Sequence, residues 1–312
     1  MRKSALVIGG QGFIGFSVAM TLYNNGWNVR ILDRNINNRF NGLNIETMVG
    51  NVFDENLMDL AMKNIDVVFY FISHSLPSSN QYNLKFELQN SLSALDSVLD
   101  TMVRLNVKKI VFPSSGGTIY GSVEEQNLTE STELNPLSSY GQGKLLSEEV
   151  IKFYSRVHNI DYLILRISNI YGCHFYRKVE QGVIDIFIQN ILNSKDISIW
   201  SGAENSVRDY IFIDDFCDAL ITLLNRSKNG IYNVGTGEGR KLIDIIQIIE
   251  RVLEREAVIV RKDNYSGVTR NVLDISKIKE DCEWSPKYNL EEGIKKTINR
   301  KKENDNEISR VH

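Results

Sequence analysis

The sequence is poor in cysteine, and the three that it has, Cys173, Cys217 and Cys282, are far apart. An odd number at wide spacings suits neither a disulfide framework nor a zinc site. Long hydrophobic runs are also missing: 67–72 is far shorter than the ~20 residues that a transmembrane helix needs. The apolar stretch at 5–8 is too short for the core of a signal peptide. We therefore expect a soluble, reduced, cytoplasmic protein.

The chain also lacks an excess of charge of either sign. Its 312 residues include 36 Lys and Arg against 39 Asp and Glu, which gives a formal net charge of −3. Nucleic-acid phosphates are bound by a dense positive field, so this balance argues against a nucleic-acid partner. Hydrophobic residues make up 42% and charged residues 24%, as in an ordinary globular protein. The length allows two domains, or one large α/β unit with an elaboration.

Short apolar runs alternate with longer amphipathic segments through the first half of the chain. Strands are predicted at 5–8, 28–32, 66–71, 109–112 and 162–165. Helices are predicted between them at 13–25, 55–63, 84–105 and 138–156. This alternation predicts right-handed βαβ crossovers, and therefore an α/β fold with a doubly wound parallel sheet and helices on both faces.

A glycine-rich turn follows the first predicted strand directly and opens the first helix. Gly9 permits a tight turn, Gly12 lets backbone N–H groups approach a pyrophosphate, and Gly15 allows the helix to pack closely on the strand. Phe13 and Ile14 form the start of the helix, whose N-terminus attracts phosphate. The alternative is that the glycines serve only as turn residues. The strand–turn–helix context favours a bound dinucleotide, NAD or NADP.

The second strand ends near Asp33, at the distance from the glycines that is expected of a Rossmann-type dinucleotide site. A carboxylate there can accept hydrogen bonds from the adenosine ribose hydroxyls and repels a 2′-phosphate, which favours NAD. Arg34 could instead meet that phosphate, so NADP stays open. We place Asn51 and Val52 in the same cofactor site.

The second half of the chain is less regular, and its clearest strand pattern lies at 231–234. We expect the sheet to recover this strand. The NAD(P)-binding domain would comprise 1–170 and about 206–235, and a smaller, discontinuous C-terminal substrate-binding domain would comprise about 171–205 and 236–300. Residues 301–312 are polar and have no apolar periodicity, so we expect a disordered tail.

Tyr140 and Lys144 lie four residues apart, on one face of a predicted helix. Tyrosine titrates near ~10, but a lysine and the positive nicotinamide of an oxidised cofactor would lower its pKa towards working pH. Taken alone, the pair could also be two surface residues. Ser115 and Thr118 follow the strand at 109–112, and hydroxyls near the carboxyl edge of such a sheet lie where ligands bind. This context favours an active site.

With these segments in this order, the chain resembles the extended short-chain dehydrogenases/reductases that act on nucleotide sugars. These include UDP-hexose 4-epimerases, sugar-nucleotide dehydratases and 4-ketoreductases. The resemblance runs from about Ala5 to Asn299 and includes the glycine turn, Asp33, 66–71, 114–121, Tyr140 with Lys144, 166–172, 207–215 and 283–286.

The resemblance implies a role for each residue of the central pair. Tyr140 would be the acid/base for a sugar hydroxyl or carbonyl, and Lys144 would hold the nicotinamide ribose and lower the pKa of the tyrosine. Gly116 stands where the common 4-epimerases carry a catalytic Ser or Thr. Ser115, slightly preferred, and Thr118 are the candidate substitutes. The same glycine disfavours sugar dehydration.

The resemblance also implies a nucleotide-diphosphate sugar as substrate. Arg208 matches the arginine that meets the substrate diphosphate, Arg270 matches a second one, and Asn169 matches an asparagine nearby. Two guanidinium groups suit a diphosphate better than two lysines. Alternatively, Arg208 forms an ion pair with Asp209 or Asp214. Family members often form homodimers through two helices, here 84–105 and 138–156.

Three functions remain open. The first is a 4-ketoreductase of a dTDP-4-keto-6-deoxyhexose, in deoxysugar and surface-polysaccharide synthesis. The second is a UDP-hexose 4-epimerase, acting on UDP-glucose or UDP-N-acetylglucosamine with tightly bound NAD. The third is a non-catalytic NAD-binding regulator, against which the intact Tyr140–Lys144 pair argues. A reductase needs only one geometry at the sugar oxygen and tolerates the loss of a hydroxyl at Gly116 more easily. The sequence therefore favours the reductase narrowly.

Overall fold

The computed structural model describes residues 2–35, 37–75, 83–123, 127–173, 182–264 and 268–311. The chain forms two compact units, each built from several segments. Unit 1 comprises Met1–Ile119, Pro136–Arg166 and Leu223–Tyr232, and unit 2 comprises Tyr120–Asn135, Ile167–Thr222 and Asn233–His312. The division differs from the expected one in that 120–135 and 206–222 fall in unit 2.

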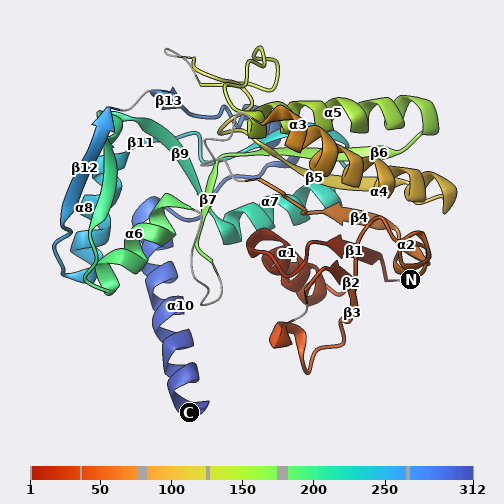
Figure 1. Ribbon diagram of the computed structural model, residues 1–312, viewed down its shortest axis with the longest axis horizontal. Helices are drawn as coiled ribbons and strands as arrows, with labels where there is room; N and C mark the ends of the chain where they lie inside the picture. Colours follow the sequence, from red (N-terminus) through yellow and green to blue (C-terminus); the bar gives the residue numbers. More distant parts are fainter. Residues whose placement is uncertain are drawn as a thin grey trace. The chain divides into compact units, whose positions relative to one another are not determined.

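A seven-stranded sheet, formed mainly by unit 1, is the largest sheet of the described residues (Figure 1). Its strands in spatial order are β10 (Gly230–Val234), β6 (Asp161–Ile167), β5 (Lys109–Ser115), β4 (Val67–Tyr70), β1 (Ser4–Ile8), β2 (Asn28–Asp33) and β3 (Glu46–Val49). β1 pairs in parallel with β2 and β4, and β2–β3 and β4–β5 are parallel as well. The predicted doubly wound parallel α/β fold is confirmed, including the return of the strand at 231–234.

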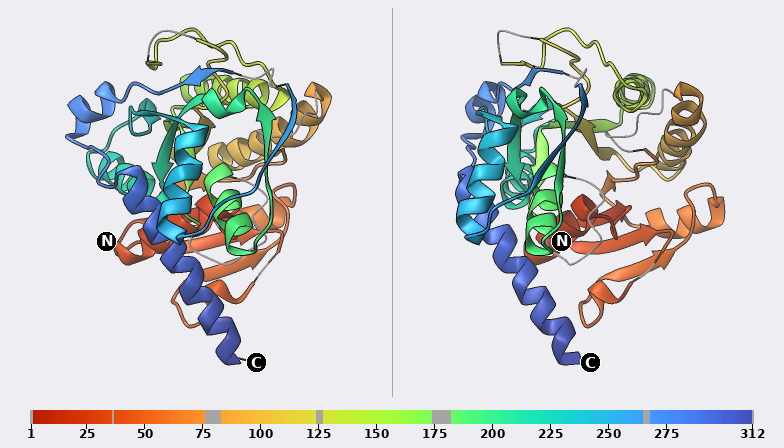
Figure 2. Two further views of the ribbon diagram at one scale, coloured as in Figure 1. Left: turned by 90° about the vertical axis from the view of Figure 1, so that its left-hand side faces the viewer. Right: turned by 60° about the vertical axis from the view of Figure 1, so that its left-hand side comes forward.

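Helices bury the two faces of this sheet. The helices are α1 (Phe13–Asn24), α2 (Glu55–Met62), α4 (Ser93–Arg104) and α5 (Ser139–His158). Leu6 and Ile8 of β1 share one buried cluster with Met58, Val98 and Ile151, which come from α2, α4 and α5. α4 and α5 contact each other on this face (Figure 2). α1 packs on β1 and β2 and adds no residue to the cluster, so it covers the other face.

The predicted helix at 84–105 is three helical pieces in the structure. A short α3 (Leu84–Phe86) leads into a π-helical segment, η2 (Glu87–Leu92), and then into α4. Asn83 fixes the start, because its side-chain oxygen accepts a hydrogen bond from the Phe86 N–H at 3.0 Å. π-Helical turns are rare and occur mostly at functional sites.

Unit 2 is built on short strands. β11 (Gly239–Lys241), β9 (Val207–Phe212) and β13 (Arg270–Asn271) form a sheet to which β7 (Asn169–Tyr171) adds by pairing with β9, and β12 (Ile259–Asn264) pairs with β8 (Ile197–Ser201). The remaining helices are α6 (Val183–Leu192), α7 (Ile213–Asn225), α8 (Leu242–Leu253), α9 (Ser276–Cys282) and α10 (Leu290–Val311).

The C-terminal segment differs from the expected disordered tail, because α10 continues as a helix to Val311. Ile294, Thr297 and Ile298 are buried, and Lys301 lies 3.7 Å from the buried Asp185 carboxylate. A helix that is already nucleated and packed adds further turns at little cost, and 301–311 contains neither glycine nor proline.

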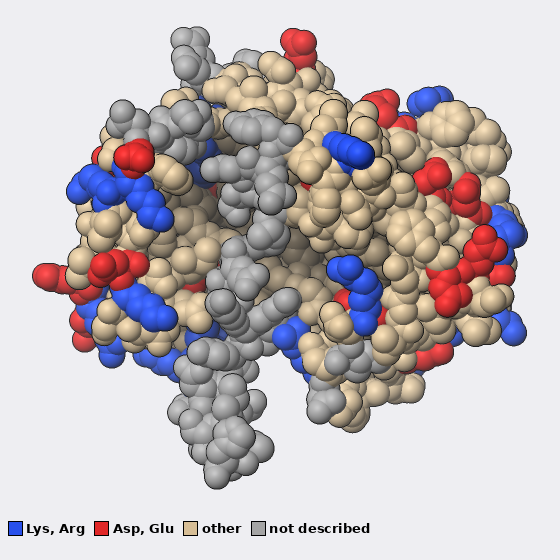
Figure 3. Space-filling view, viewed as in Figure 1, with Lys and Arg blue, Asp and Glu red and all other residues tan. Residues whose placement is uncertain are grey.

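The surface agrees with the balanced composition. Basic and acidic side chains are interspersed over the right-hand part of the face drawn in Figure 3. Among the helices of the described residues, none is both long enough and apolar enough to cross a membrane.

Candidate active site

The glycine turn between β1 and α1 is tightly packed against its surroundings. Gly9 has a φ of 80°, and a Cβ at this position would lie 2.9 Å from the backbone of Phe71. A Cβ at Gly15 would lie 2.3 Å from the Gly9 carbonyl oxygen. At Gly12, which caps α1, a Cβ would meet only that oxygen, at 3.3 Å. Gly9 and Gly15 are therefore needed for packing, whereas Gly12 leaves the backbone open to an approaching group.

Asp33 braces this turn from the end of β2. Its Oδ2 accepts a hydrogen bond from the Gln11 N–H at 2.9 Å. Its carbonyl accepts one from the N–H of Gly50 at 3.0 Å, which brings Asn51 and Val52 to the same edge of the sheet. These predicted cofactor residues thus gather at the carboxyl ends of β1, β2 and β3.

Gln11 and Arg39 belong to this edge as well, although the sequence did not single them out. Arg39 donates from Nη1 to the Gln11 carbonyl at 2.8 Å. The Gln11 side chain is buried, and neither its oxygen nor its nitrogen has a hydrogen-bond partner in the described residues. An unpaired buried amide is costly, so it marks a place where a polar ligand is expected. Together with the open Gly12 backbone, it fits a dinucleotide.

Tyr140 and Lys144 lie in the first turns of α5, beside the end of β5. Ser138 caps the helix by accepting a hydrogen bond from the Gly141 N–H at 3.1 Å. The side chain of Ser115, the last residue of β5, is close enough to Tyr140 to lower the pKa of the phenol. Lys144 donates from Nζ to the Pro113 carbonyl at 2.8 Å, and its Nζ lies 5.7 Å from the centre of the Tyr140 ring. The structure thus brings the predicted pair and one of the two candidate hydroxyls together.

Burial shifts both pKa values of the pair. It raises the pKa of Tyr140 to about 12, although the hydrogen bond from Ser115 lowers it. It lowers the pKa of Lys144 to about 8, while the carboxylates of Glu87 and Glu148 act in the opposite direction. With only the chain's own groups present, Tyr140 therefore keeps its proton at neutral pH.

Ser115 and Thr118 are distinguished by their partners. The Ser115 side chain acts on Tyr140 and lowers its pKa, whereas the Thr118 hydroxyl is buried and has no hydrogen-bond partner in the described residues. Both lie in one turn, because the Thr118 N–H donates to the Ser115 carbonyl at 3.2 Å. The geometry favours Ser115 as the replacement for the hydroxyl that is missing at Gly116.

A buried ion pair anchors α5 to the sheet. Arg166 of β6 and Glu148 of α5 are 2% and 0% exposed, and their side chains meet at 2.8 Å. The Ser114 hydroxyl donates to the same carboxylate at 2.6 Å. One carboxylate thus ties together the ends of β5 and β6 and the helix that carries Tyr140 and Lys144.

A small polar pocket lies against this pair within unit 1. Among its lining residues are Tyr70, Ser75, Glu87, Tyr140 and Lys144. The hydroxyls of Tyr70 and Ser75 are buried and have no hydrogen-bond partner in the described residues. Glu87 was not predicted as a site residue from the sequence, although there was a signal, because a carboxylate occupies an inward position of the amphipathic segment 84–105.

The predicted substrate residues lie together in unit 2, on and beside β9. Asn169 donates from Nδ2 to the Asp209 carbonyl at 2.9 Å. Arg208 donates to the carbonyls of Val207 and Val268, and its neighbour Asp209 is fully buried. Asp214, the alternative partner of Arg208, accepts two hydrogen bonds from Arg300, at 2.7 and 2.9 Å.

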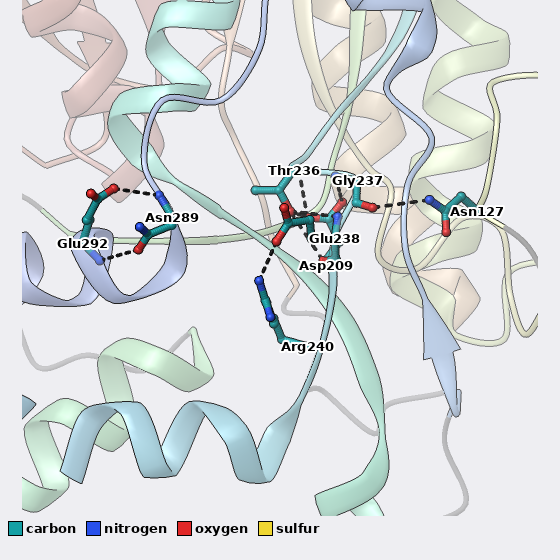
Figure 4. Close-up of polar contacts among 8 residues, drawn as sticks. All are labelled: Asn127, Asp209, Thr236, Gly237, Glu238, Arg240, Asn289 and Glu292. Atoms are coloured by element: carbon teal, nitrogen blue, oxygen red, sulfur yellow. Dashed lines mark hydrogen bonds and ion pairs between the residues drawn. The ribbon is translucent and has the colours of Figure 1, made fainter. Parts of the chain in front are cut away.

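Asp209 organises the turn that follows β10 (Figure 4). Its Oδ1 accepts hydrogen bonds from the N–H and the hydroxyl of Thr236, at 2.9 and 2.7 Å, and its Oδ2 accepts one from the Gly237 N–H at 3.1 Å. Burial raises the pKa of Asp209, and these hydrogen bonds act against the rise. Asn127 reaches the same turn by donating to the Gly237 carbonyl at 3.3 Å.

Arg270 lies beside this network but not on the same face of the sheet as Arg208. It is paired with Val207 across β13 and β9, and residues one apart in a strand point to opposite faces. Its Nη2 donates to the Asn127 side-chain oxygen at 2.8 Å. Arg240 of β11, which was not predicted as a site residue from the sequence, is directly opposite Arg208 in the sheet.

Comparison with known proteins identifies the family. Residues 5–235 match the model described as the NAD dependent epimerase/dehydratase family. A putative UDP-glucose 4-epimerase of Methanocaldococcus jannaschii is 35% identical over 303 residues, which cover 96% of this chain and 98% of the relative. A dTDP-4-dehydro-6-deoxyglucose reductase of Escherichia coli is 29% identical, covering 95% of this chain and 97% of its own.

The solved structures agree. The UDP-glucose 4-epimerase of Bifidobacterium longum in complex with NAD+ and UDP superposes with a TM-score of 0.86 at 25% identity, covering 97% of this chain and 99% of its own. This likeness and the family match confirm the resemblance that the motifs predicted, and NAD is the cofactor in the family's description. The chain is therefore an enzyme that belongs to the NAD-dependent epimerase/dehydratase family of extended short-chain dehydrogenases/reductases.

Proposed function

We propose that this enzyme is a UDP-hexose 4-epimerase. The observation that carries the proposal is the position of Ser115 at the end of β5, where its side chain is close enough to Tyr140 to lower the pKa of the phenol. An epimerase must move a proton at O4 of both stereoisomers, and a hydroxyl next to the phenol can bridge to the oxygen that lies too far from it. The sequence favours a reductase because Gly116 lacks this hydroxyl, and Ser115 supplies it. The relatives named above include UDP-glucose 4-epimerases, which supports the same choice.

The residues of unit 1 fit the cofactor. The backbone from Gly9 to Gly15 and the start of α1 would hold the pyrophosphate, and Asp33 the adenosine ribose. Asn51 and Val52 would border the adenine side of the site, and Lys144 would hold the nicotinamide ribose. Bound NAD+ would supply a nicotinamide ring that accepts the hydride from C4 of the sugar, and a positive charge near the Tyr140 phenol.

The proton at the sugar is moved by the chain's own groups. Tyr140 takes the proton of the sugar's 4-hydroxyl as carbon C4 is oxidised. It returns the proton when the 4-hydroxyl is formed again. Its pKa of about 12 must fall for this, and positive charge beside the phenol has that effect. Ser115 relays the proton for the second stereoisomer. Unit 2 would hold the substrate diphosphate through Arg208 and Asn169, whereas Arg270, on the other face of the sheet, is not expected to share this contact.

A second candidate is the 4-ketoreductase of a dTDP-4-keto-6-deoxyhexose. One specific observation favours it: Tyr140 is protonated in the chain alone, as a reductase's proton donor must be. The Escherichia coli relative is named as an enzyme of this type. In this reaction bound NADH or NADPH would supply the hydride for the carbonyl carbon, and Tyr140 would deliver its proton to O4.

One pair of assays separates the functions. The purified enzyme is incubated with UDP-glucose or UDP-N-acetylglucosamine, without added reductant, and the sugar products are resolved by chromatography. A second mixture contains dTDP-4-keto-6-deoxyglucose with NADH or NADPH, and nicotinamide oxidation is followed at 340 nm. We expect the 4-epimer in the first mixture and little oxidation in the second. Oxidation without epimer formation would establish the reductase, and NAD binding without either reaction would favour the regulator.

The proposal includes a homodimer formed by the helices of one face of unit 1. Five large apolar side chains of α3, η2 and α5 are exposed: Leu84, Phe86, Leu88, Phe153 and Val157. α5 contacts both α3 and η2, so these side chains belong to one group of adjacent helices. Large apolar groups gathered in this way are typical of a protein interface.

A further inference from the structure

A carboxylate is buried beside Tyr140 and Lys144 for which the proposed reaction has no role. Glu87 is 3% exposed and lines the same pocket as the two residues. It is the first residue of η2, and its Oε2 accepts a hydrogen bond from the Ser91 hydroxyl at 2.7 Å. Buried carboxylates are rare unless they are paired, so its position needs an explanation.

The local structure is arranged to admit this side chain between two helices. A Cβ at Gly143 of α5 would lie 2.9 Å from Glu87 Oε2 and 3.2 Å from Glu87 Cβ. The missing side chain at 143 therefore makes the room that the carboxylate occupies. Gly143 directly precedes Lys144, so Glu87 enters the space next to the lysine. The π-helical turn that starts at Glu87 adds a rare backbone conformation at the same point.

The charged and titratable groups around Lys144 come from each element packed against it. α5 itself contributes Glu148 and Tyr140, η2 contributes Glu87, and the end of β4 contributes Tyr70, whose pKa burial raises. Glu148 is already engaged by Arg166 and Ser114. Of these two carboxylates, Glu87 is the one that no arginine neutralises in the described contacts, so its charge can act on Lys144.

His74 completes these surroundings. It lies in the loop after β4, where burial and the charge of Arg34 lower its pKa and the charge of Glu87 raises it. The net direction is downward, so His74 is neutral at neutral pH and adds no positive charge near Lys144.

We propose that Glu87 is a positioning residue that acts through Lys144, by keeping the buried ammonium charged and oriented in the cofactor site. The proposal rests on the role assigned to Lys144 in the proposed function. Burial alone would drive the lysine towards its neutral form, which has no charge to stabilise a phenolate at Tyr140. Of the charges that raise the pKa of Lys144, Glu87 has the largest effect, followed by Glu148.

The magnitude shows why one carboxylate can decide the charge state. With Glu87 present, the pKa of Lys144 is about 8, just above neutral pH. A neighbouring opposite charge shifts a pKa by roughly 1–3 units, so its loss would bring the pKa of Lys144 to neutral pH or below. At neutral pH a large part of the enzyme would then hold an uncharged lysine.

The test reads the lysine directly. The protein is prepared with 13C at lysine Cε, and the Lys144 signal is assigned by its absence in Lys144→Arg. Its chemical shift is followed by NMR from pH 6 to 11 in the wild type and in Glu87→Gln. We expect the midpoint to fall by roughly one pH unit or more in Glu87→Gln. A midpoint equal to that of the wild type would overturn the proposal.

Matched variants separate charge from packing. Glu149 lies on α5, the helix of Lys144, and its exposed carboxylate pairs only with Lys152 in the described contacts. Glu149→Gln should therefore leave the titration midpoint of Lys144 unchanged. Glu87→Asp keeps the charge and should retain most of the wild-type midpoint. The glutamine can still accept the Ser91 hydrogen bond, so urea unfolding should show a folded Glu87→Gln. An equal fall in Glu87→Asp would mean that packing, not charge, is responsible.

Turnover provides a separate readout. If Lys144 acts in catalysis, the alkaline limb of kcat/KM on the nucleotide sugar should move to lower pH in Glu87→Gln by the same amount as the NMR midpoint. A shifted midpoint with an unshifted limb would refute the link to catalysis. If the wild type turns over no nucleotide sugar, the proposed function fails, while the titration still decides whether Glu87 holds the charge on Lys144.

Discussion

Tyr140 and Ser115 come from α5 and β5, and the Ser115 side chain lowers the pKa of the Tyr140 phenol. We expect Tyr140→Phe to lower kcat by about 10²–10⁴-fold, since the phenylalanine cannot transfer a proton. NAD binding should change little, because the ring and Lys144 remain. Turnover of the nucleotide sugar and NAD titration by protein fluorescence measure the two effects. Activity close to the wild type would refute the acid/base role of Tyr140.

Removing the Ser115 hydroxyl and removing the Thr118 hydroxyl should have different effects on turnover. Ser115→Ala should lower kcat, because it removes the hydroxyl that lowers the pKa of Tyr140. Thr118→Val keeps the shape of the side chain and removes a buried hydroxyl without a partner, so activity should be retained and the free energy of unfolding should stay equal or rise. Side-by-side kinetics and urea unfolding test both variants. A loss confined to Thr118→Val would reverse the assignment.

Individual site residues could be predicted from the sequence where a local motif determines their geometry. Gly9, Gly15 and the Tyr140–Lys144 spacing could be predicted because each depends on neighbours close in the chain. The choice between Ser115 and Thr118 could not, since it depends on which hydroxyl the turn directs towards α5. Glu87 was missed because its place in the pocket depends on another helix, where Gly143 leaves room for its side chain.

Among the helices, α5 carries both Tyr140 and Lys144, so its attachment to the sheet fixes the site. Arg166→Met should lower the free energy of unfolding by about 3–5 kcal/mol, because it leaves the Glu148 carboxylate buried without its partner. Lys152→Met, on the exposed pair with Glu149, is the matched control and should cost about 0–1 kcal/mol. Urea unfolding followed by circular dichroism measures both values. Equal losses would show that the buried pair does not anchor the helix.

The elements also divide into those that the sequence predicts and those that it does not. β1, β4 and β5 are apolar runs within βαβ units, and their alternation with amphipathic helices identifies them. β7, β11 and β13 have two or three residues each, too few for any periodicity. They exist because β9 provides edges with which they pair, and that is a tertiary effect.

The preference for NAD over NADP can be measured on the whole molecule, because a bound dinucleotide raises the free energy of unfolding of every part that unfolds together with its site. At 100 times its Kd, NAD should raise the free energy of unfolding by about 2.7 kcal/mol. NADP at the same concentration should have a smaller effect, because its 2′-phosphate would meet the Asp33 carboxylate. Asp33→Asn should reduce this difference. Equal stabilisation of the wild type by both cofactors would contradict the preference for NAD.

The proposed dimer predicts a mass in solution of twice the 35.6 kDa chain. Size-exclusion chromatography with light scattering measures it. Phe153 and Val157 are 51% and 54% exposed on α5, and Phe153→Glu should shift the protein to the monomer because a charge would be buried in the interface. Trp200→Glu, at an exposed residue of unit 2, is the control and should leave the mass unchanged. A wild-type monomer would refute the dimer.

The edge strand β10 has a consequence for the synthesis of the protein. β6 ends at Ile167, but β10, its neighbour on one side in the sheet, begins only at Gly230, after all of β7 to α7 has been made. At ~5–20 residues per second, the ribosome releases β10 several seconds after β6. During that interval the nascent sheet exposes the unpaired edge of β6 to other chains. The protein should therefore depend on chaperones most strongly during this part of translation, even though the finished sheet has this edge covered.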